Sequence, residues 1–524
     1  MKKSVCNIVL ILLLCALLSA CGGVAAAAAA ADTASTAEAR TEEEISIRLS
    51  DRGSTASDES VLIRGSTVTV TQAGTYRISG ELSDGQIVVD ADESAKVKLI
   101  LDGADISKNG SAAVYAVSAD KVILSSAEGS VNSLSSTGEF VQTDENHVDA
   151  AVFAKCDLNL NGDGSVDISC ESGHGVVSKD DLKLKDGVWN ISASGKGLCG
   201  KDSVTVEDGS AVVRAGDDAV HSDDIVTVSG GELSLASGDD GIHADNTLEI
   251  SGGSIDVTES YEGLEAMDID ISGGSIRIAA SDDGVNAAGG SDGSNAFGPF
   301  GGDPFASGSG SLSIRGGSLT IDAGGDGLDS NGALDVSGGT VYVSGPTNSG
   351  NGAIDYNGSA TVSGGTVIAV GASGMAENFG SGSTQGSILL NLPSAQVPGS
   401  TVSVSDEKGK VLASFTPTKS YQSVVISTEG IELGGTYTVT AGAVTETITL
   451  DSVTYGSGTG MGGPGMQMGG MGGPGAQTGG MGGHGGRRGE LGGPGGWPGG
   501  TDGMTGATPP SGDAGFEGRD DFRF

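Results

Sequence analysis

The fold is decided by the stretch Asp239-Asp240-Gly241-Ile242-His243, because close copies of it recur along the chain. The copies are Asp217-Asp218-Ala219-Val220-His221, Tyr261-Glu262-Gly263-Leu264-Glu265, Asp282-Asp283-Gly284-Val285-Asn286 and Gly325-Asp326-Gly327-Leu328-Asp329. The small central residue falls at positions 219, 241, 263 and 284, in steps of 22, 22 and 21. A fixed period of this size is typical of stacked structural units.

Short runs with strand composition lie between the acidic turns. Examples are Ile225–Val228, Ser254–Val257 and Ser275–Ile278, and Ser-Gly-Gly turns separate them. No run with helical periodicity longer than a turn follows the N-terminal leader. Two or three strands per unit fit one coil of a parallel β-helix, so we expect an all-β fold in which each coil contacts only its neighbours. The residues predicted to stack inward are Val220, Ile242, Leu264, Val285 and Leu328.

The composition divides the chain into five parts. We expect a lipoprotein signal peptide at 1–21, a tether at 22–44, the β-helix at 45–386, a small antiparallel β module at 387–454 and a disordered Gly/Met-rich tail at 455–524. The first coils of the helix, 45–157, lack the acidic pattern, whereas 158–386 contain it. The glycine-rich insertion near 289–310 carries three phenylalanines, and we interpret it as a loose excursion.

Stacking the coils places acidic side chains in two columns. The first column is Asp218, Asp240, Glu262, Asp283 and Asp326; the second is His221, His243, Glu265, Asn286 and Asp329. Neighbouring strands lie roughly 4.8 Å apart, and two carboxylates at such a distance repel by roughly 1 kcal/mol even in water. Hard divalent cations with oxygen ligands relieve this repulsion, so we expect calcium. The candidate ligands are Asp217, Asp218, Asp239, Asp240, Glu262, Glu265, Asp282, Asp283, Asn286, Asp326 and Asp329.

Two alternatives to calcium remain open at this stage. Asp and Gly favour turns, so the acids are also explained as solvated turn residues. Protonation also relieves the repulsion, at the cost of raised pKa values. Basic side chains are scarce: from Gly216 to Ser400 only Arg277 and Arg315 occur, besides the two histidines. The histidines are interpreted as hydrogen-bonding groups outside the first coordination shell, because calcium prefers oxygen.

The net charge excludes one class of function, and the N-terminal residues indicate where the protein is located. The formal charge of −41 over 524 residues excludes a nucleic-acid binder. Lys2-Lys3, a short apolar run and Leu18-Ser19-Ala20-Cys21 are typical of a secretory signal that ends in a bacterial lipobox. We therefore expect lipidation of Cys21 and a location on the extracellular face of the bacterial cell membrane. Three cysteines remain in the body of the chain, and whether Cys156, Cys170 or Cys199 pair is left open.

Two further segments carry a resemblance. They are Ala73-Gly74-Thr75-Tyr76-Arg77-Ile78-Ser79-Gly80-Glu81-Leu82-Ser83-Asp84-Gly85-Gln86-Ile87-Val88-Val89-Asp90 and Val97-Lys98-Leu99-Ile100-Leu101-Asp102-Gly103-Ala104-Asp105-Ile106. With the acidic coils, they resemble a family of secreted bacterial carbohydrate-binding proteins. The resemblance implies a right-handed parallel β-helix, bound calcium at the first column and a polysaccharide partner such as polygalacturonate or cellulose. The chain departs from the pattern at Tyr261 and Gly325.

Three functions compete. The favoured hypothesis is calcium-dependent binding of an acidic polysaccharide by a monomer, without catalysis. The second is a surface scaffold or adhesin with structural calcium. The third is a polysaccharide lyase, which needs a base beside its metal; Arg277 and Arg315 follow or adjoin Gly-Gly turns and are poor candidates. No pair of carboxylates stands out as the catalytic pair of a glycosidase.

Overall fold

The computed structural model describes residues 44–288 and 310–456. The predictions for the leader, for the lipidated Cys21, for the phenylalanine-rich insertion and for nearly all of the tether and the tail therefore lie outside the described residues. Within the described ranges the chain forms strands and no helix, which confirms the all-β prediction. Accordingly, no helix in these ranges has the length and hydropathy needed to cross a membrane.

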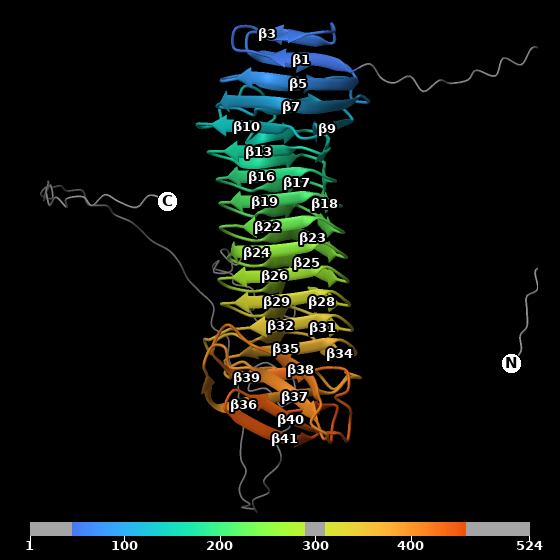
Figure 1. Ribbon diagram of the computed structural model, residues 1–524, viewed down its shortest axis with the longest axis vertical. Coiled ribbons are helices and arrows are strands. Elements are labelled where there is room, and N and C mark those ends of the chain that lie inside the picture. The colour runs from blue at the N-terminus through green and yellow to red at the C-terminus, as the bar shows by residue number, and fades with distance from the viewer. Residues whose placement is uncertain (1–43, 289–309, 457–524) are drawn as a thin grey trace, which may run out of the picture. The chain divides into compact units, whose positions relative to one another are not determined.

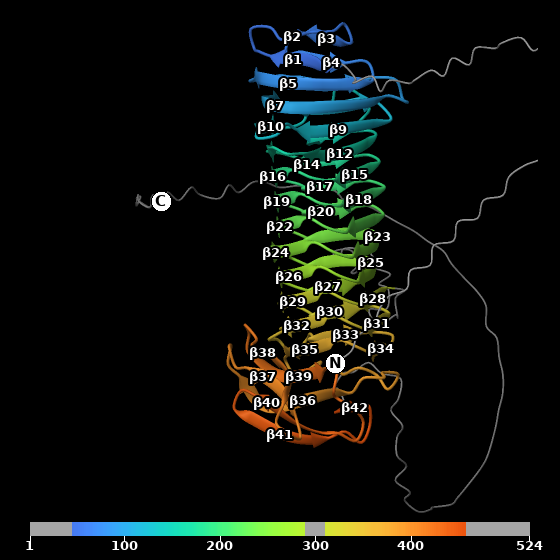
Figure 2. The same ribbon diagram turned by 45° about the vertical axis from the view of Figure 1, so that its right-hand side comes forward.

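Strands of successive coils pair in parallel and build a β-helix with three faces (Figure 1). One face, in front in Figure 1, contains β5 (Gly74–Leu82), β7 (Lys96–Asn109), β10 (Val131–Thr137), β13 (Ser165–Cys170), β16 (Val188–Ala193), β19 (Ser210–Ala215), β22 (Glu232–Ala236), β24 (Ser254–Ser260), β26 (Ser275–Ala280), β29 (Ser318–Ala323), β32 (Thr340–Ser344) and β35 (Thr366–Gly371). The second face contains β4 (Thr67–Val70), β6 (Gln86–Asp90), β8 (Val114–Ser118), β11 (Ala150–Ala154), β14 (His174–Ser178), β17 (Leu198–Gly200), β20 (Val220–Ser222), β27 (Val285–Ala287), β30 (Leu328–Ser330) and β33 (Ile354–Tyr356). The third contains β1 (Ile45–Leu49), β9 (Lys121–Ser126), β12 (Asp157–Gly162), β15 (Asp181–Leu184), β18 (Ser203–Val206), β21 (Ile225–Val228), β28 (Ser311–Ile314), β31 (Ala333–Val336) and β34 (Ala360–Val362). Four longer strands each cross two faces (Figure 2): β5 and β7 run from the third face onto the first, and β23 (Ile242–Ile250) and β25 (Leu264–Ile271) run from the second onto the third.

The predicted inward stack is confirmed. Val220 pairs with Ile242, Ile242 with Leu264, Leu264 with Val285 and Val285 with Leu328, always in parallel register. All five side chains are fully buried. The period of the sequence therefore sets the register of the coils, because a slip of one residue would turn every one of these side chains outward.

The stacking of the coils also explains the recurrent Gly-Gly turns. The second glycine adopts a positive φ in successive coils, for example 84° at Gly253 and 86° at Gly274. The first glycine lies against the coil before it: a Cβ at Gly252 would lie 2.3 Å from the carbonyl oxygen of Ser229. Glycine is therefore needed at both positions, once for backbone conformation and once for close approach.

Both ends of the described stack are covered by antiparallel strands. At the first coils β2 (Thr55–Ala56) pairs with β1, and β3 (Val61–Arg64) pairs with β4. At the other end β39 (Tyr421–Ser427) pairs antiparallel with both β35 and β36 (Ser387–Gln396), and β42 (Thr454–Tyr455) adds to β36. A separate antiparallel sheet holds β37 (Val402–Asp406), β38 (Val411–Phe415), β40 (Thr436–Ala441) and β41 (Val444–Thr449). The predicted antiparallel module is thus present, and it covers an edge that would otherwise be free to pair.

The three cysteines of the β-helix are unpaired. Cys156 and Cys170 are buried, and Cys199 is partly buried. Burial raises the pKa of the Cys156 thiol to about 11 and that of Cys199 to about 12. These thiols therefore behave as small apolar residues.

Candidate functional site

The two columns predicted from the sequence exist as continuous rows of side chains. In the second column His221 pairs with His243, His243 with Glu265, Glu265 with Asn286 and Asn286 with Asp329. The first column lies in the turns that precede these strands. There a carboxylate of one coil accepts a hydrogen bond from the backbone of the next: Asp218 accepts from the Asp240 N–H at 3.1 Å, and Asp283 accepts from the Asp326 N–H at 2.5 Å.

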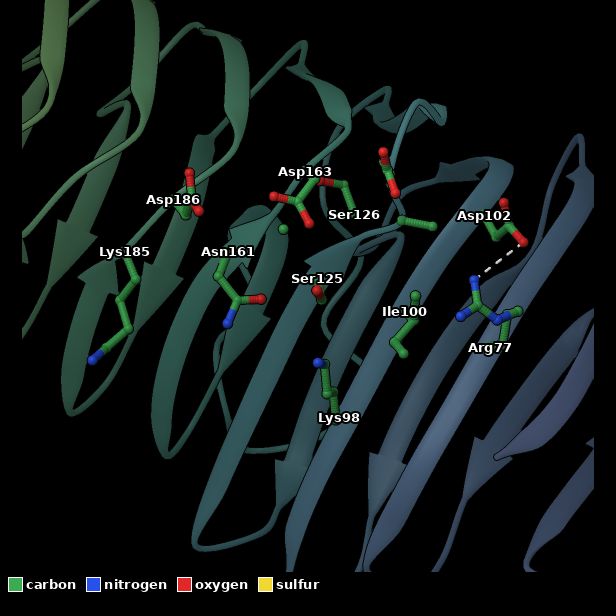
Figure 3. A pocket seen from close by; sticks show the side chains of 13 residues that line it. Arg77, Lys98, Ile100, Asp102, Ser125, Ser126, Asn161, Asp163, Lys185 and Asp186 are labelled. Carbon is green, nitrogen blue, oxygen red and sulfur yellow. Dashed lines mark hydrogen bonds and ion pairs between the residues drawn. The ribbon is translucent and has the colours of Figure 1, made fainter. Parts of the chain in front are cut away.

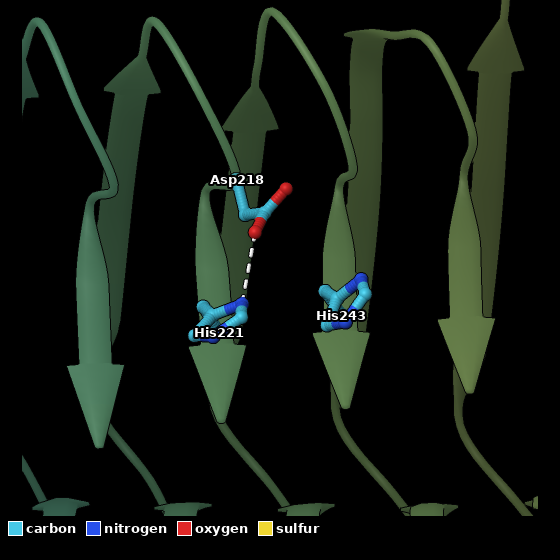
Figure 4. Close-up of side chains that lie close together, drawn as sticks. All are labelled: Asp218, His221 and His243. Carbon is cyan, nitrogen blue, oxygen red and sulfur yellow. Dashed lines mark hydrogen bonds and ion pairs between the residues drawn. The ribbon is translucent and has the colours of Figure 1, made fainter. Parts of the chain in front are cut away.

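At the N-terminal end of the columns the negative charge meets cations that belong to the chain. The Lys196 ammonium lies 2.5 Å from Asp218 and 3.3 Å from Asp217. His221 adds a contact of 2.9 Å between its Nδ1 and the same Asp218 oxygen (Figure 4). Although burial alone would raise it, His221 and Lys196 hold the pKa of Asp218 well below its ordinary value.

One coil further on, a histidine lies between two buried carboxylates. His243 Nδ1 is 2.8 Å from Asp240 Oδ2 and 2.8 Å from Glu265 Oε2. Its Nε2 is 3.1 Å from Asp245 Oδ1, just as His221 Nε2 is 3.1 Å from Asp223 Oδ1. The two imidazole rings stack with centroids 4.9 Å apart. Figure 4 shows them side by side on neighbouring strands.

The middle of the columns has amide rather than cationic partners. Asn286 donates from Nδ2 to Glu262 Oε2 at 2.8 Å. Burial, followed by the charge of Glu265, raises the pKa of Glu262 to about 9. The side-chain oxygen of Asn286, Oδ1, is buried and has no hydrogen-bond partner in the structure, and the residue as a whole is only 8% exposed. A buried acceptor without a donor is costly, and it marks a place where a cation would be stabilised.

At the C-terminal end three carboxylates converge: Asp283, Asp326 and Asp329 offer oxygen atoms that all lie within 4.8 Å of one another. Burial raises the pKa of Asp283 to about 6, and burial together with the charge of Asp283 raises that of Asp329 to about 7 and that of Asp326 to about 8. No Lys, Arg or His pairs with these three residues in the ranges that the structure describes. We call them the aspartate cluster.

The remaining predicted ligands lie at the margin of the columns. Asp217 lies beside Lys196 and forms a group with Asp218 and Asp239 whose oxygens are within 4.8 Å. Asp282 accepts a hydrogen bond from the Tyr261 hydroxyl, and this contact raises the pKa of Tyr261 to about 12. The structure therefore divides the predicted set into a part with histidine or lysine, a middle part with Asn286, and the aspartate cluster.

Several members of the site were missed by sequence reasoning. Asp355 continues the second column, in register with Asp329, and Glu377 lies close enough for its pKa to be raised to about 7, by burial and then by the charge of Asp355. The signal for Asp355 was present in Ala353-Ile354-Asp355, a displaced copy of the repeat. Lys196 was also missed, because the count of basic residues began at Gly216, one coil too late. Arg277 and Arg315 pair outside the columns, Arg277 with Asp256 and Arg315 with Asp270.

A polar groove of about 720 Å³ crosses coils near the N-terminal end of the stack, away from the two acidic columns. Its lining comes from successive strands of the stack: Arg77, Ile100, Ser125 and Asn161 occupy equivalent positions of β5, β7, β9 and β12. Figure 3 shows Lys98 and Lys185 along one side and Asp163 and Asp186 along the other.

Two groups in this groove lack partners. Lys98 forms no ion pair with any described residue, whereas Arg77 pairs with Glu44 and Asp102, and Lys185 pairs with Glu207. The Asn161 side-chain oxygen is buried and accepts no hydrogen bond. The groove therefore offers a free ammonium and a free amide acceptor, two coils apart, to a ligand rich in hydroxyl or carboxylate groups.

The sequence matches a family of known proteins. A family model described as carbohydrate-binding domain-containing protein matches residues 64–294 and 305–468. A protein of that description from Acetivibrio thermocellus is 32% identical over 128 residues, which are 24% of this chain and 45% of the relative. The match thus spans less than half of that relative. A solved structure of a polysaccharide lyase-like protein from C. thermocellum, a gadolinium derivative, aligns at 21% identity with a TM-score of 0.36, over 61% of this chain and 97% of the other.

Proposed function

Because the chain belongs to the family of carbohydrate-binding domain-containing proteins, we propose that it binds an acidic polysaccharide of the polygalacturonate kind. We propose further that calcium at the C-terminal end of the columns supports this binding, and that lipidation of Cys21 keeps a monomer at the outer face of the cell membrane. The protein holds the polymer and does not cleave it.

The aspartate cluster is the observation that carries the proposal. Its three carboxylates lie within 4.8 Å of one another without a cation from the chain, as far as the described residues extend. The unpaired side-chain oxygen of Asn286 belongs to the same coil as Asp283, and Asp355 continues the column beyond Asp329. All of these donors are oxygen atoms, which is the donor set that calcium prefers. The residues present therefore fit the ion.

The chain's own residues determine what the site does. Asp283, Asp326 and Asp329 repel one another and gain from any cation between them. Their half-buried position keeps one side of the cluster in contact with solvent, where a sugar carboxylate can approach. Calcium bound there supplies open coordination positions for sugar oxygens, since it takes six to eight ligands. This reconciles an acidic protein with an acidic partner.

The groove of the first coils supports a second contact with the same polymer. Lys98 pairs with no described residue and suits a uronate carboxylate, and the Asn161 oxygen suits a sugar hydroxyl. Its lining residues recur at the strand spacing, roughly 4.8 Å, so an extended chain can follow the axis of the stack. Contact of this kind needs no metal.

The test measures binding of polygalacturonate by calorimetry, with calcium and with a chelator. We expect the chelator to weaken binding strongly. The double variant Asp283→Asn/Asp326→Asn, measured with calcium, should bind polygalacturonate as weakly as the wild type does with the chelator. Glu249→Gln is the matched control, because Glu249 is an exposed carboxylate outside the columns. Lys98→Ala should weaken binding by a similar factor with calcium and with the chelator, because the contact in the groove needs no metal.

Two results would overturn the proposal in favour of the alternatives. Release of unsaturated oligosaccharides during incubation with calcium would make the protein a lyase. Absence of affinity for polygalacturonate, cellulose and other cell-wall polymers, with a calcium-dependent melting temperature, would leave a scaffold or adhesin with structural calcium.

A further inference from the structure

The histidine-containing part of the columns has a donor set that calcium does not favour. Three atoms converge there: His243 Nδ1, Asp240 Oδ2 and Glu265 Oε2, with the nitrogen 2.8 Å from each oxygen. The three residues are 5%, 2% and 5% exposed. Calcium takes oxygen ligands almost exclusively, whereas imidazole together with carboxylate suits zinc and other first-row divalent ions.

The separations of these atoms come close to what such an ion needs. Two ligands that share a zinc ion at 2.0–2.2 Å in a tetrahedral arrangement lie roughly 3.3–3.6 Å apart. The observed contacts of 2.8 Å are hydrogen-bond distances, so the side chains would move apart by roughly half an ångström when the ion binds. The same three residues form a group whose ligand atoms lie within 4.8 Å of one another. A second group of this kind, Asp218, His221 and His243, adjoins it and shares His243.

Each imidazole is also held in the orientation that a ligand needs. His243 Nε2 faces Asp245 Oδ1 and His221 Nε2 faces Asp223 Oδ1, both at 3.1 Å. A carboxylate on one ring nitrogen keeps the proton there and leaves the other nitrogen to the metal, as in many zinc sites. The motif is His-x-Asp in both coils, His221-Ser222-Asp223 and His243-Ala244-Asp245. The Nδ1 atoms of both histidines accordingly face the first-column carboxylates.

Both carboxylate oxygens of Asp218 already have partners, so we do not count Asp218 among the ligands. Its Oδ2 is in contact with Lys196 Nζ and its Oδ1 accepts the Asp240 N–H. Figure 4 shows Asp218 joined to His221, with the ring of His243 beside it. The open donors are therefore His243, Asp240 and Glu265, with His221 next to them.

We propose that Asp240, His243 and Glu265 bind a zinc-type divalent ion, with His221 as a neighbouring nitrogen donor, separately from the oxygen-only aspartate cluster. The inference does not rest on carbohydrate binding. The competing account is that His243 remains doubly protonated and is itself the cation between the two carboxylates, as Lys196 is for Asp218.

The test uses the full chain, freed of metal and then saturated with calcium to occupy the oxygen sites. Zinc is titrated by calorimetry, and cobalt(II) is added as a spectroscopic substitute. We expect tight binding of zinc that calcium does not displace, and a visible cobalt spectrum with nitrogen and oxygen ligands. Asp245→Asn should weaken the zinc affinity roughly tenfold to hundredfold, as loss of a group that orients a ligand does.

The controls separate this site from adventitious histidines. His243→Gln should abolish the cobalt spectrum, whereas His147→Gln, in an exposed loop, and His484→Gln should leave it unchanged. Unfolding of His243→Gln would be detected by its circular dichroism, and the wild-type titration decides the matter without it. Absence of zinc and cobalt binding to the calcium-saturated protein would establish the protonated histidine instead. So would binding that persists undiminished in Asp245→Asn and in a folded His243→Gln variant.

Discussion

Replacing Asp326 by Asn should change the stability in opposite directions with and without calcium. In the aspartate cluster the oxygens of Asp283, Asp326 and Asp329 lie within 4.8 Å of one another. At an effective dielectric constant of 20, two charges at that distance repel by about 3 kcal/mol. Asp326 takes part in two of the three pairs, so its neutralisation removes most of the repulsion. The substitution keeps an oxygen that can accept the Gly352 N–H.

The measurable gain is smaller than the sum of these pair energies. Side chains turn apart, salt screens them, and part of the repulsion is already relieved by protons, since the pKa of Asp326 is raised to about 8, mainly by burial. At pH 9 in a chelator, where the carboxylates are ionised, we expect Asp326→Asn to stabilise the protein by about 2 kcal/mol, a rise of a few degrees in melting temperature.

Calcium should reverse the order of the two proteins. An ion bound at a hundred times its dissociation constant stabilises the folded wild type by about 2.7 kcal/mol, and the variant lacks a ligand for it. The assay is thermal unfolding followed by circular dichroism at pH 9, with chelator and with calcium, for the wild type, Asp326→Asn and the control Glu249→Gln. Equal shifts in Asp326→Asn and in the control, or a destabilised Asp326→Asn variant in the chelator, would refute the reasoning.

Three further predictions follow from the stack. Without metal, the free energy of unfolding should fall as pH rises from 5 to 9. Burial raises the folded-state pKa of Glu262 to about 9 and that of Asp326 to about 8, above their unfolded values, so the folded state binds more protons in this range. A melting temperature that rises over this range in chelator would contradict this prediction. Leu264→Ala should cost about 2–5 kcal/mol because the side chain is fully buried in the central stack, whereas Leu62→Ala, at a residue 45% exposed, should cost little in urea unfolding. Gly263→Ala should be strongly destabilising, since its Cβ would lie 2.3 Å from the Gly284 carbonyl oxygen. The control is Gly382→Ala, whose Cβ would have its nearest atom at 3.4 Å. Similar melting temperatures for the two variants would show that the backbone at Gly263 can move to make room for a Cβ.

The repeat predicted the β-helix because it encodes the fold locally. Each copy supplies a turn, a small residue that permits close approach, and an aliphatic residue for the core, and the equal spacing aligns the copies. Val220, Ile242 and Leu264 therefore stack as expected. The two columns followed from the same register, which no later element of the chain changes.

The rest of the site could not be predicted because it depends on contacts that the repeat does not encode. Lys196 replaces an acid in a degenerate copy, and only the stack shows that its ammonium reaches Asp218. The groove joins Ile100, Ser125 and Asn161 from coils of unequal length, so their alignment appears only once β7, β9 and β12 are paired. Burial of the carboxylates, which sets their pKa values, is likewise a property of the packed coils.

The repulsion between stacked carboxylates is compensated differently from one coil to the next. The backbone positions are equivalent, so the residue of the second column determines which cation suits each place. Near His221 the chain supplies its own ammonium from Lys196. At His243 the donors are one nitrogen and two oxygens, and at Asp329 they are oxygens alone. The two proposed ion sites therefore share one register along one axis, because each added coil changes the donor set without changing the fold.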